Sequence, residues 1–318
     1  MKEQEILVTV LMPVYNGVEY IREAIDSILD QTFKHFELVI VNDGSTDETE
    51  SIIKSYTDTR IKLINQQNGG VSAALNTGLK HARAKYIVRF DADDVSYRNR
   101  LEVQYNFMLQ NPDYILVGSD ADYMTKEGTF IYTYKNVGHT NEEINQTIVQ
   151  HCSFIHSSVI YLKDLVISLG GYDVRAHTFE DYFLWKKLIK KGKVCNLRQP
   201  LLKVRFNSSS VTIDEKDHDP AFIRLKRKAL SEGKISEADG NEILEKCKGL
   251  SKEKKENSYN RMLGKKFLWD NYKPKNARQY LWKSIKAEPL VFSGYLLIIF
   301  SFFPESVIKM IYENNKVR

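Results

Sequence analysis

The first 120 residues alternate short apolar runs with segments of helical spacing, and this alternation constrains the fold more than any other feature. Strands and helices that alternate at this pitch form βαβ units, because a parallel strand needs a crossover before the next one. We therefore predict an α/β fold with a mostly parallel, Rossmann-like sheet flanked by helices. The expected strands span residues 7–12, 37–41, 61–64, 86–90 and 115–118, and the expected helices 19–29, 47–56, 71–82 and 99–109.

The pattern loosens after residue 140, and from residue 216 the sequence is helical and highly charged. We predict a first domain over residues 1–215, divided near residue 120 into halves 1–120 and 121–215. A basic helical region is expected over residues 216–318. With 42% hydrophobic residues in a chain of 318, a sizeable core can be buried and we expect no wholesale disorder.

The spacing of the cysteines bears on the cellular compartment, and the distribution of charge bears on the kind of partner. The three cysteines are far apart and show neither metal spacing nor a disulfide framework, which suits a reducing cytoplasm. The net charge of +5 is unevenly distributed: residues 1–215 carry 24 basic against 28 acidic side chains, and residues 216–318 carry 22 against 13. A basic segment suits a nucleic acid, a membrane surface or solubility. Because no nucleic-acid-binding motif is present, we expect no nucleic-acid partner.

Polar, turn-forming residues follow four consecutive expected strands. In a parallel sheet the carboxyl ends of the strands meet at one edge, and ligands bind beyond that edge. A single polar turn there is ordinary loop chemistry, but four in succession favour a site. The residues are Pro13 and Tyr15 after the first strand, Asp43 after the second, Asn68 after the third, and Asp91, Asp93 and Asp94 after the fourth.

The three carboxylates after the fourth strand need compensation, because carboxylates this close together repel one another. Asp91 and Asp93 are separated by one small residue and can together ligate a hard cation such as Mg²⁺ or Mn²⁺, with the phosphates of a substrate completing the site. The alternative is that Asp93 or Asp94 caps the next helix. Capping accounts for one acid and poorly for three, so we favour the cation.

With these motifs the chain resembles glycosyltransferase family 2, whose members have the GT-A nucleotide-sugar fold. The resemblance covers residues 6–215 and depends on five segments in the family's order and spacing. The segments are VTVLMPVYNGVEYIREAIDSILDQTF, FELVIVNDGSTDET, GGVSAALNTGLKHARAKYIVRFDADD, GGYD and FEDYFLWKKL. The resemblance implies a catalytic GT-A domain with a nucleotide-sugar half and an acceptor half.

The resemblance also implies roles for individual residues on the donor side. Pro13 and Tyr15 would frame the nucleotide base, Asp43 would bind its edge, and Asn68 would offer a second base contact. Asp91 would meet the ribose, and Asp93, together with Asp91, the Mn²⁺ or Mg²⁺ on the donor diphosphate. An aromatic ring and a carboxylate suit a base physically, since the ring stacks on it and the carboxylate accepts its N–H.

On the acceptor side, Glu180 and Asp181 open an expected amphipathic helix. By themselves they fit a favourable interaction with the helix dipole. The resemblance implies that Asp181 is the general base that takes the proton of the attacking acceptor hydroxyl, and that Glu180 orients the loop or binds the acceptor. With a cation on the leaving diphosphate, one base suffices for a single displacement with inversion.

Two positions depart from the family's pattern. Leu75 stands where the family often has Arg, which leaves the nucleobase open. The segment Arg205-Phe206-Asn207 lacks the His of the family's R-x-H, which leaves open a further contact to the diphosphate or metal. His151 and His156 are either acceptor contacts or structural histidines.

The most apolar stretch, PLVFSGYLLIIFSFFP, spans residues 289–304. The 14 residues between its prolines would reach about 21 Å as a helix, which is short of the roughly 30 Å hydrocarbon core of a bilayer. Basic residues precede it, and we expect a helix that lies in the interface of an anionic membrane. A helix packed on the catalytic domain, or an oligomer contact, stays open as an alternative.

These inferences combine into one functional hypothesis. We expect a cytoplasmic enzyme, peripheral on the inner face of the cell membrane, that moves a hexose from a UDP-sugar to a saccharide or lipid-linked saccharide in surface polysaccharide biosynthesis. A sugar-phosphate nucleotidyltransferase is the rival enzyme, but it would need a Gly-rich, Arg-containing loop where PVYNGVEY stands. A non-catalytic nucleotide-sugar binder or membrane scaffold is disfavoured by the complete set of acids.

Overall fold

The computed structural model describes residues 5–206, 219–247, 252–290 and 292–316. The chain divides into two compact units. Unit 1 comprises residues 1–121, 134–204 and 220–246, and unit 2 comprises residues 122–133, 205–219 and 247–318. The domain boundary expected after residue 215 lies outside the described residues and stays a prediction.

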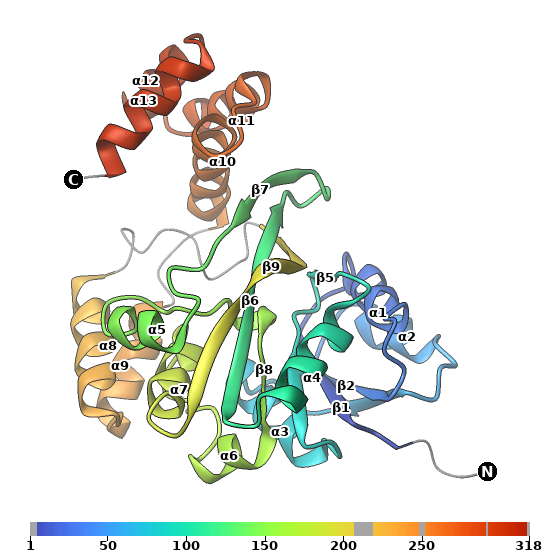
Figure 1. The fold of residues 1–318 in the computed structure, drawn as a ribbon. Coiled ribbons are helices and arrows are strands. Elements are labelled where there is room, and N and C mark those ends of the chain that lie inside the picture. The colour runs from blue at the N-terminus through green and yellow to red at the C-terminus, as the bar shows by residue number, and fades with distance from the viewer. Residues whose placement is uncertain (1–4, 207–218, 248–251, 291, 317–318) are drawn as a thin grey trace. The chain divides into compact units, whose positions relative to one another are not determined.

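A mixed sheet organises the fold, with the strand order β3-β2-β1-β4-β8-β6-β9-β5 and β7 paired to β6 (Figure 1). The β1–β2, β1–β4 and β2–β3 pairs are parallel, whereas β4–β8, β6–β8 and β5–β9 are antiparallel. The α/β fold is therefore confirmed, and these three parallel pairs all lie among the first four strands. The strands are β1 (Val8–Val14), β2 (Phe36–Asn42), β3 (Ile61–Asn65), β4 (Tyr86–Arg89), β5 (Val95–Ser96), β6 (Tyr114–Met124), β7 (Phe130–Tyr134), β8 (Ile160–Leu162) and β9 (Lys193–Arg205).

Helices of unit 1 follow the strands in the alternation that the sequence predicts. They are α1 (Ile21–Leu29), α2 (Thr49–Lys54), α3 (Val71–His81), α4 (Arg100–Gln110), α5 (Asn141–Thr147), α6 (Lys163–Ser168), α7 (Glu180–Leu188), α8 (Pro220–Glu232) and α9 (Glu237–Cys247), with a short 3₁₀ turn η1 (His156–Ser158). The expected helix that Glu180 and Asp181 open is α7, which ends at Leu188 with Ile189 as its C-cap.

Both faces of the parallel strands are covered, which explains why every residue of β1 is buried. Val10 and Met12 pack in one cluster with Ile25 of α1. Leu11 points to the other face, where α3 approaches so closely that only Gly78 fits against it. Figure 1 shows α1 and α2 on one side of these strands and α3 on the other. Alternation of side chains along each strand thus builds two apolar layers.

Unit 2 contains the last four helices and a β hairpin. The helices share an apolar cluster with Ile131 of β7, built on α10 residues Tyr259, Leu263 and Phe267. Within the described part of the chain, no helix has both the length and the apolar character needed to cross a membrane. The helices are α10 (Lys252–Trp269), α11 (Pro274–Ala287), α12 (Phe292–Phe300) and α13 (Glu305–Lys316).

Candidate active site

The order of the parallel strands locates the candidate site within unit 1. The chain adds β2 and β3 on one side of β1 and then places β4 on the other side. The direction in which strands are added therefore reverses between β1 and β4, and the loops that leave these two strands diverge. In open α/β sheets, ligands bind in the crevice at such a point of reversal, the switch point. Of the residues expected to bind the donor, Tyr15, Asp43, Asn68, Asp91 and Asp93 follow the carboxyl ends of these four strands. Pro13, which was expected after the first strand, lies within β1 and pairs with Val41.

The loops after β1 and β2 are tied to each other. The backbone N–H of Asn16 donates to Ser45 Oγ at 2.9 Å, and Asn16 Oδ1 accepts from the Thr46 N–H at 2.8 Å. Asn16 has a φ of 51°, in the left-handed region that Asn tolerates better than most residues. This turn leaves the preceding Tyr15 half exposed and Pro13 buried beneath it, so the Tyr15 ring is accessible for stacking.

Asp43 is buried, and its carboxylate holds the loop before α3. Oδ1 accepts from Gln66 Nε2 at 2.7 Å and from the Gly69 N–H at 2.9 Å, and Oδ2 accepts from the Gly70 N–H at 2.8 Å. An ionised carboxylate can accept about four hydrogen bonds, so one position remains for a ligand. The role at a base edge stays a prediction, and the structure adds a second role that the sequence pattern did not indicate.

Position 44, next to Asp43, requires glycine because the backbone of Asn68 passes close to it. Its φ is 75°, and a Cβ there would lie 2.9 Å from the backbone nitrogen of Asn68. A larger residue would push Asn68, which is exposed, away from the end of β2. The turn DGS is therefore part of the loop packing that places the predicted base contacts.

The three acids after β4 occupy different environments. The Asp91 side chain is 35% exposed and forms an ion pair with buried Arg89. Asp93 is partly exposed, whereas Asp94 is buried. The alternative that one of these acids caps the next helix is wrong, because α4 begins only at Arg100, with Asn99 at its N-cap position.

Asp94 interacts electrostatically with the buried side chain of Arg100. Arg100 is completely buried, donates from Nη2 to the backbone oxygen of Arg89 at 2.9 Å and from Nε to Gln104 Oε1 at 3.0 Å. Burial lowers the pKa of Arg100 to about 9, and the charge of Asp94 opposes that shift. Of the three acids, Asp94 is thus buried within the fold, whereas Asp91 and Asp93 are partly exposed.

Antiparallel pairing brings the acceptor side to the same edge of the sheet. Because β8 runs against β4, the residues just before β8 lie beside the residues just after β4. The Arg89 N–H donates to the Val159 oxygen at 3.0 Å, and His156 on η1 precedes Val159 by three residues. His156 Nε2 lies 3.3 Å from the hydroxyl of Tyr172, and its Nδ1 lies 3.9 Å from Glu180 Oε1.

The GGYD turn is clamped to the donor half. The Tyr172 N–H donates to Asn76 Oδ1 at 2.9 Å, and Asn76 Nδ2 donates back to the Tyr172 oxygen at 2.8 Å. Gly171 has a φ of 70°, and a Cβ there would lie 2.4 Å from the same Asn76 Oδ1. Only glycine permits this contact, which fixes the buried Tyr172 ring beside His156.

Glu180 and Asp181 begin α7 and differ in exposure. Glu180 is buried and its Oε2 has no hydrogen-bond partner, whereas Asp181 is partly exposed. Burial, followed by the charge of Asp181, raises the pKa of Glu180 to about 7. Burial also raises the pKa of Asp181, although the Tyr182 N–H, which donates to Oδ1 at 2.6 Å, acts against it.

Arg89 is the positive charge shared by the two acidic pairs. It pairs with Asp91 on the donor side, and its charge lowers the pKa of both Glu180 and Asp181 against the effect of their burial. Burial and the charge of Arg89 also hold the pKa of His156 well below its usual range, so this imidazole is neutral. The sequence interpretation missed Arg89; the signal was a single Arg inside an apolar strand directly before three acids.

The remaining candidate residues have different environments. His151 is exposed, and Leu75 is buried in α3. Arg205 belongs to unit 2, where its Nη1 donates to the Lys126 oxygen at 2.8 Å, and Asn207 lies outside the described residues. Cys152, which was not expected near the site, lies with Sγ 3.9 Å from Asp181 Oδ2.

Comparison with known proteins identifies relatives of this arrangement. Residues 9–167 match the model of glycosyl transferase family 2. An uncharacterised glycosyltransferase of Rickettsia prowazekii is 33% identical over 216 residues, which cover 65% of this chain and 66% of the relative. The O-antigen biosynthesis glycosyltransferase WbnJ of Escherichia coli is 34% identical over 210 residues, 64% of this chain and 81% of WbnJ. The match thus leaves about a third of the Rickettsia relative uncovered.

Two solved structures share the fold at low sequence identity. A fragment of S. aureus TarS in complex with UDP superposes with a TM-score of 0.57 at 17% identity, covering 98% of this chain and 92% of TarS. The mannosyltransferase PcManGT of Pyrobaculum calidifontis, in complex with GDP-Man and Mn²⁺, gives a TM-score of 0.52 at 18% identity over 97% of this chain and 84% of its own. The resemblance seen in the sequence is confirmed: this chain is a member of glycosyltransferase family 2 with a GT-A-like fold.

Proposed function

We propose that the protein transfers a hexose, with inversion, from a UDP-linked donor to a saccharide or lipid-linked saccharide in the biosynthesis of a surface polysaccharide. The observation that carries the proposal is the arrangement around Arg89, which joins an accessible acidic pair after β4 to a second acidic pair at the start of α7. Sugar transfer needs two such positions, one for the donor diphosphate and one for the acceptor hydroxyl.

The donor position is supported by the loops at the switch point. The half-exposed Tyr15 ring offers a stacking surface. Asp43 holds the loop that carries Asn68 by accepting hydrogen bonds from the N–H groups of Gly69 and Gly70. The fold neighbour TarS was solved with UDP and with UDP-GlcNAc, and PcManGT with GDP-Man. These neighbours support a nucleotide-sugar donor, and we propose uridine as the base.

Asp91 and Asp93 suit a divalent cation that is shared with the substrate. In the described ranges, no group of three or more His, Cys, Asp or Glu side chains could hold a metal without help. Two carboxylates at a strand end are the ligand set that Mg²⁺ or Mn²⁺ uses when phosphates supply the remaining oxygens. When bound, such a cation would stabilise the negative charge of the leaving diphosphate.

Asp181 is the proposed base because it alone of the α7 pair reaches solvent. Its raised pKa improves its ability to accept a proton from an acceptor hydroxyl. Buried Glu180, with a pKa of about 7, is half protonated near neutrality, so the α7 pair carries less than two negative charges. We propose that Glu180 orients Asp181 and the start of the helix, and that Arg89 limits how far both pKa values rise.

A relative supports the proposed class of acceptor. WbnJ is named as an O-antigen biosynthesis glycosyltransferase, which supports a glycan acceptor for this chain. We propose that the enzyme works on the cytoplasmic side of the membrane, where nucleotide sugars are made. Family membership favours this reaction over the nucleotidyltransferase and scaffold alternatives.

Calorimetric titration with UDP, GDP and dTDP, with and without Mn²⁺, tests the donor side. We expect UDP to bind most tightly, with Mn²⁺ strengthening the binding, and Asp93→Ala to abolish the Mn²⁺ effect. Asp164→Ala is the matched control, because Asp164 is an almost fully exposed acid on α6. Equal affinity of Asp93→Ala and the control with Mn²⁺ would remove the cation site from the proposal.

Asp181→Asn tests the acceptor side. The variant should bind UDP like the wild type and lose transfer by a factor of roughly 10² to 10⁴, the usual contribution of a positioned general base. The assay measures UDP release from UDP-sugar with a lipid-linked saccharide. Full activity of Asp181→Asn would exclude it as the base, whereas loss of UDP binding would assign it to the donor site.

A further inference from the structure

Helix α12 is apolar at every position except Ser293, but only one side of it is covered. Gly294, Leu297 and Ile298 are buried, and Gly294 lies against α11. The residues on the opposite side recur at helical spacing, continue into the next turn, and are exposed by 39% to 84%. They form the α12 face, which comprises Phe292, Tyr295, Leu296, Ile299, Phe302 and Phe303.

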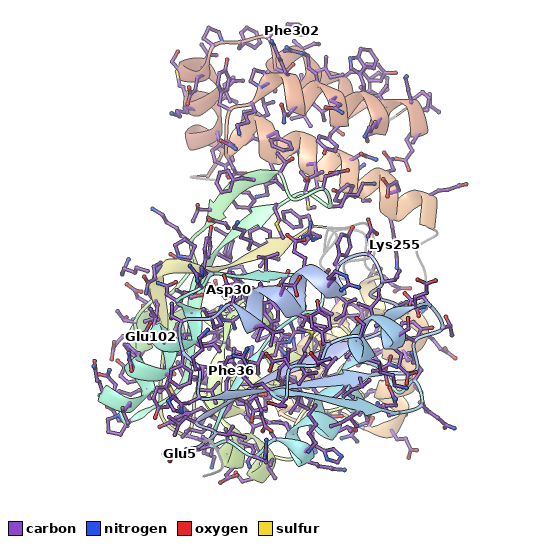
Figure 2. The ribbon with its side chains drawn as sticks, turned by 90° about the vertical axis from the view of Figure 1, so that its right-hand side faces the viewer. Glu5, Asp30, Phe36, Glu102, Lys255 and Phe302 are labelled. Carbon is purple, nitrogen blue, oxygen red and sulfur yellow. The ribbon has the colours of Figure 1, made fainter. Side chains whose placement is uncertain are left out.

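The size of the α12 face sets it apart from scattered surface hydrophobics. Four of its six side chains are aromatic, each with a surface of roughly 150–250 Å². The exposed apolar area is on the order of 600 Å², at the upper end of the largest patch on a typical monomer, roughly 300–600 Å². Figure 2 places Phe302 at the outer edge of unit 2. A surface of this size is typical of an interaction site.

Helix α11 runs antiparallel to α12 and packs on its covered side. Ile285 meets Gly294 near one end, and Arg278 Nη1 donates to the Ser301 oxygen at 2.9 Å near the other. The guanidinium of Arg278 also lies 4.6 Å from the centre of the Phe302 ring. A basic side chain is therefore in direct contact with the α12 face.

Arg278 is one member of a basic stripe on α11. Lys275, Arg278, Trp282 and Lys286 recur at spacings of three or four residues, so they share one side of the helix. Lys275 and Lys286 are exposed, and Trp282 is half exposed between them. An apolar helix face bordered by Lys, Arg and Trp is typical of a helix that lies at a membrane–water interface.

We propose that the α12 face and the basic stripe dock on an anionic lipid bilayer, with α12 lying in the plane of the interface. Residues 216–318 carry 22 basic against 13 acidic side chains, which complements anionic headgroups. A second copy of the chain is a poorer occupant. A two-fold contact through this surface would bring two basic stripes together, and interface cores are depleted in lysine.

Vesicle co-sedimentation of the full chain tests the proposal. The vesicles are phosphatidylcholine alone and a phosphatidylcholine–phosphatidylglycerol mixture. We expect binding to the mixture that weakens with salt, and much weaker binding to phosphatidylcholine alone. The inference is independent of the proposed transfer reaction, because UDP titration reports on unit 1 and vesicle binding reports on unit 2.

Two matched pairs of variants assign the binding to this surface. The triple variant Phe292→Ser/Leu296→Ser/Ile299→Ser should lose about a hundredfold in partition or more. Its control is Leu109→Ser/Val149→Ser/Ile167→Ser, which alters equally exposed apolar residues of unit 1 and should bind like the wild type.

A second pair of variants, which removes lysine charges, measures the electrostatic part of the attachment separately from the apolar part. Lys275→Gln/Lys286→Gln should weaken partition about thirtyfold, and Lys80→Gln/Lys190→Gln, exposed lysines of unit 1, should not. The lysine variants remove no buried contact, so they test the proposal even if the triple serine variant fails to fold. The membrane proposal would be overturned if the wild type failed to bind the mixed vesicles. It would also be overturned if a control variant lost as much vesicle binding as its matched test variant. A dimer that dissociates in the triple variant would assign the face to self-association.

Discussion

Replacing Glu180 with Gln is expected to stabilise the protein above neutral pH and to change little in acid. The carboxyl is buried, and its Oε2 has no hydrogen-bond partner. Burial, followed by the charge of Asp181, raises the pKa of Glu180 from 4.5 to about 7. A carboxyl with a raised pKa binds its proton more strongly in the folded state, so its contribution to stability is present below pH 4.5 and is lost as pH rises toward 7.

The magnitude follows from the size of the shift. One pKa unit corresponds to about 1.4 kcal/mol, so ionisation of Glu180 weakens the folded state by about 3 kcal/mol. Gln keeps the shape of the side chain without the charge. Its N–H groups need partners in a site built for a carboxyl, at a cost of about 1 kcal/mol. The expected net gain is about 2 kcal/mol near pH 8, and the variant should be slightly less stable than the wild type near pH 4.

Urea denaturation followed by circular dichroism, across that range of pH, measures the difference. Asp164→Asn serves as the control, since it makes the same chemical change at an almost fully exposed side chain. Because the charge of Asp181 contributes to the shift, Asp181→Asn should move the pH dependence of wild-type stability to lower pH. A Glu180→Gln variant that is less stable than the wild type at every pH would refute the reasoning, because Glu180 would then be stabilising as an anion.

Three further substitutions probe the donor side. Asp43→Asn should lower stability by about 1–3 kcal/mol and weaken UDP binding, because one amide oxygen cannot hold Gln66 and both glycine N–H groups; unchanged values in denaturation and titration would contradict this. Gly44→Ala should destabilise by about 1–3 kcal/mol, since its φ is 75° and its Cβ would meet the Asn68 backbone; a smaller loss would mean that the loop yields. Arg89→Met should cost about 1–3 kcal/mol, less than a fully buried pair because Asp91 is partly hydrated. Combining Arg89→Met with Asp91→Asn should restore part of that loss, and strict additivity would show that the pair contributes nothing.

Local features of the sequence were sufficient for the parallel half of the fold. Apolar runs of strand length and helical spacing between them depend only on neighbouring residues, and they predicted β1 to β4 and the helices between them. The same alternation could not predict that β8 joins β4 antiparallel, because residues 160–162 make too short a strand to carry a periodic signal. Pairing direction there depends on contacts between distant segments.

The apolar segment at residues 289–304 shows the same limit of prediction from local sequence. Its composition predicted an apolar helix near residues 289–304, and α12 occupies residues 292–300. The pattern could not distinguish a packed helix from an exposed one, because α12 carries apolar residues on every side. Packing on α11 covers Gly294, Leu297 and Ile298 and leaves the α12 face open. The covered side of α12 thus packs on α11, and attachment of the exposed side to a membrane stays a proposal.

By itself, the sequence determined which acids the site contains and the order in which the chain presents them, since motifs and spacing are properties of the chain. Only the tertiary structure decided the environment of each acid. It buried Asp94 and Glu180, left Asp91, Asp93 and Asp181 partly exposed, and engaged Asp43 with the loop before α3. It also placed Arg89 where its charge acts on both acidic pairs. The physical reason is that burial and charge proximity set the behaviour of a carboxyl, and both arise only when segments far apart in the chain are brought together.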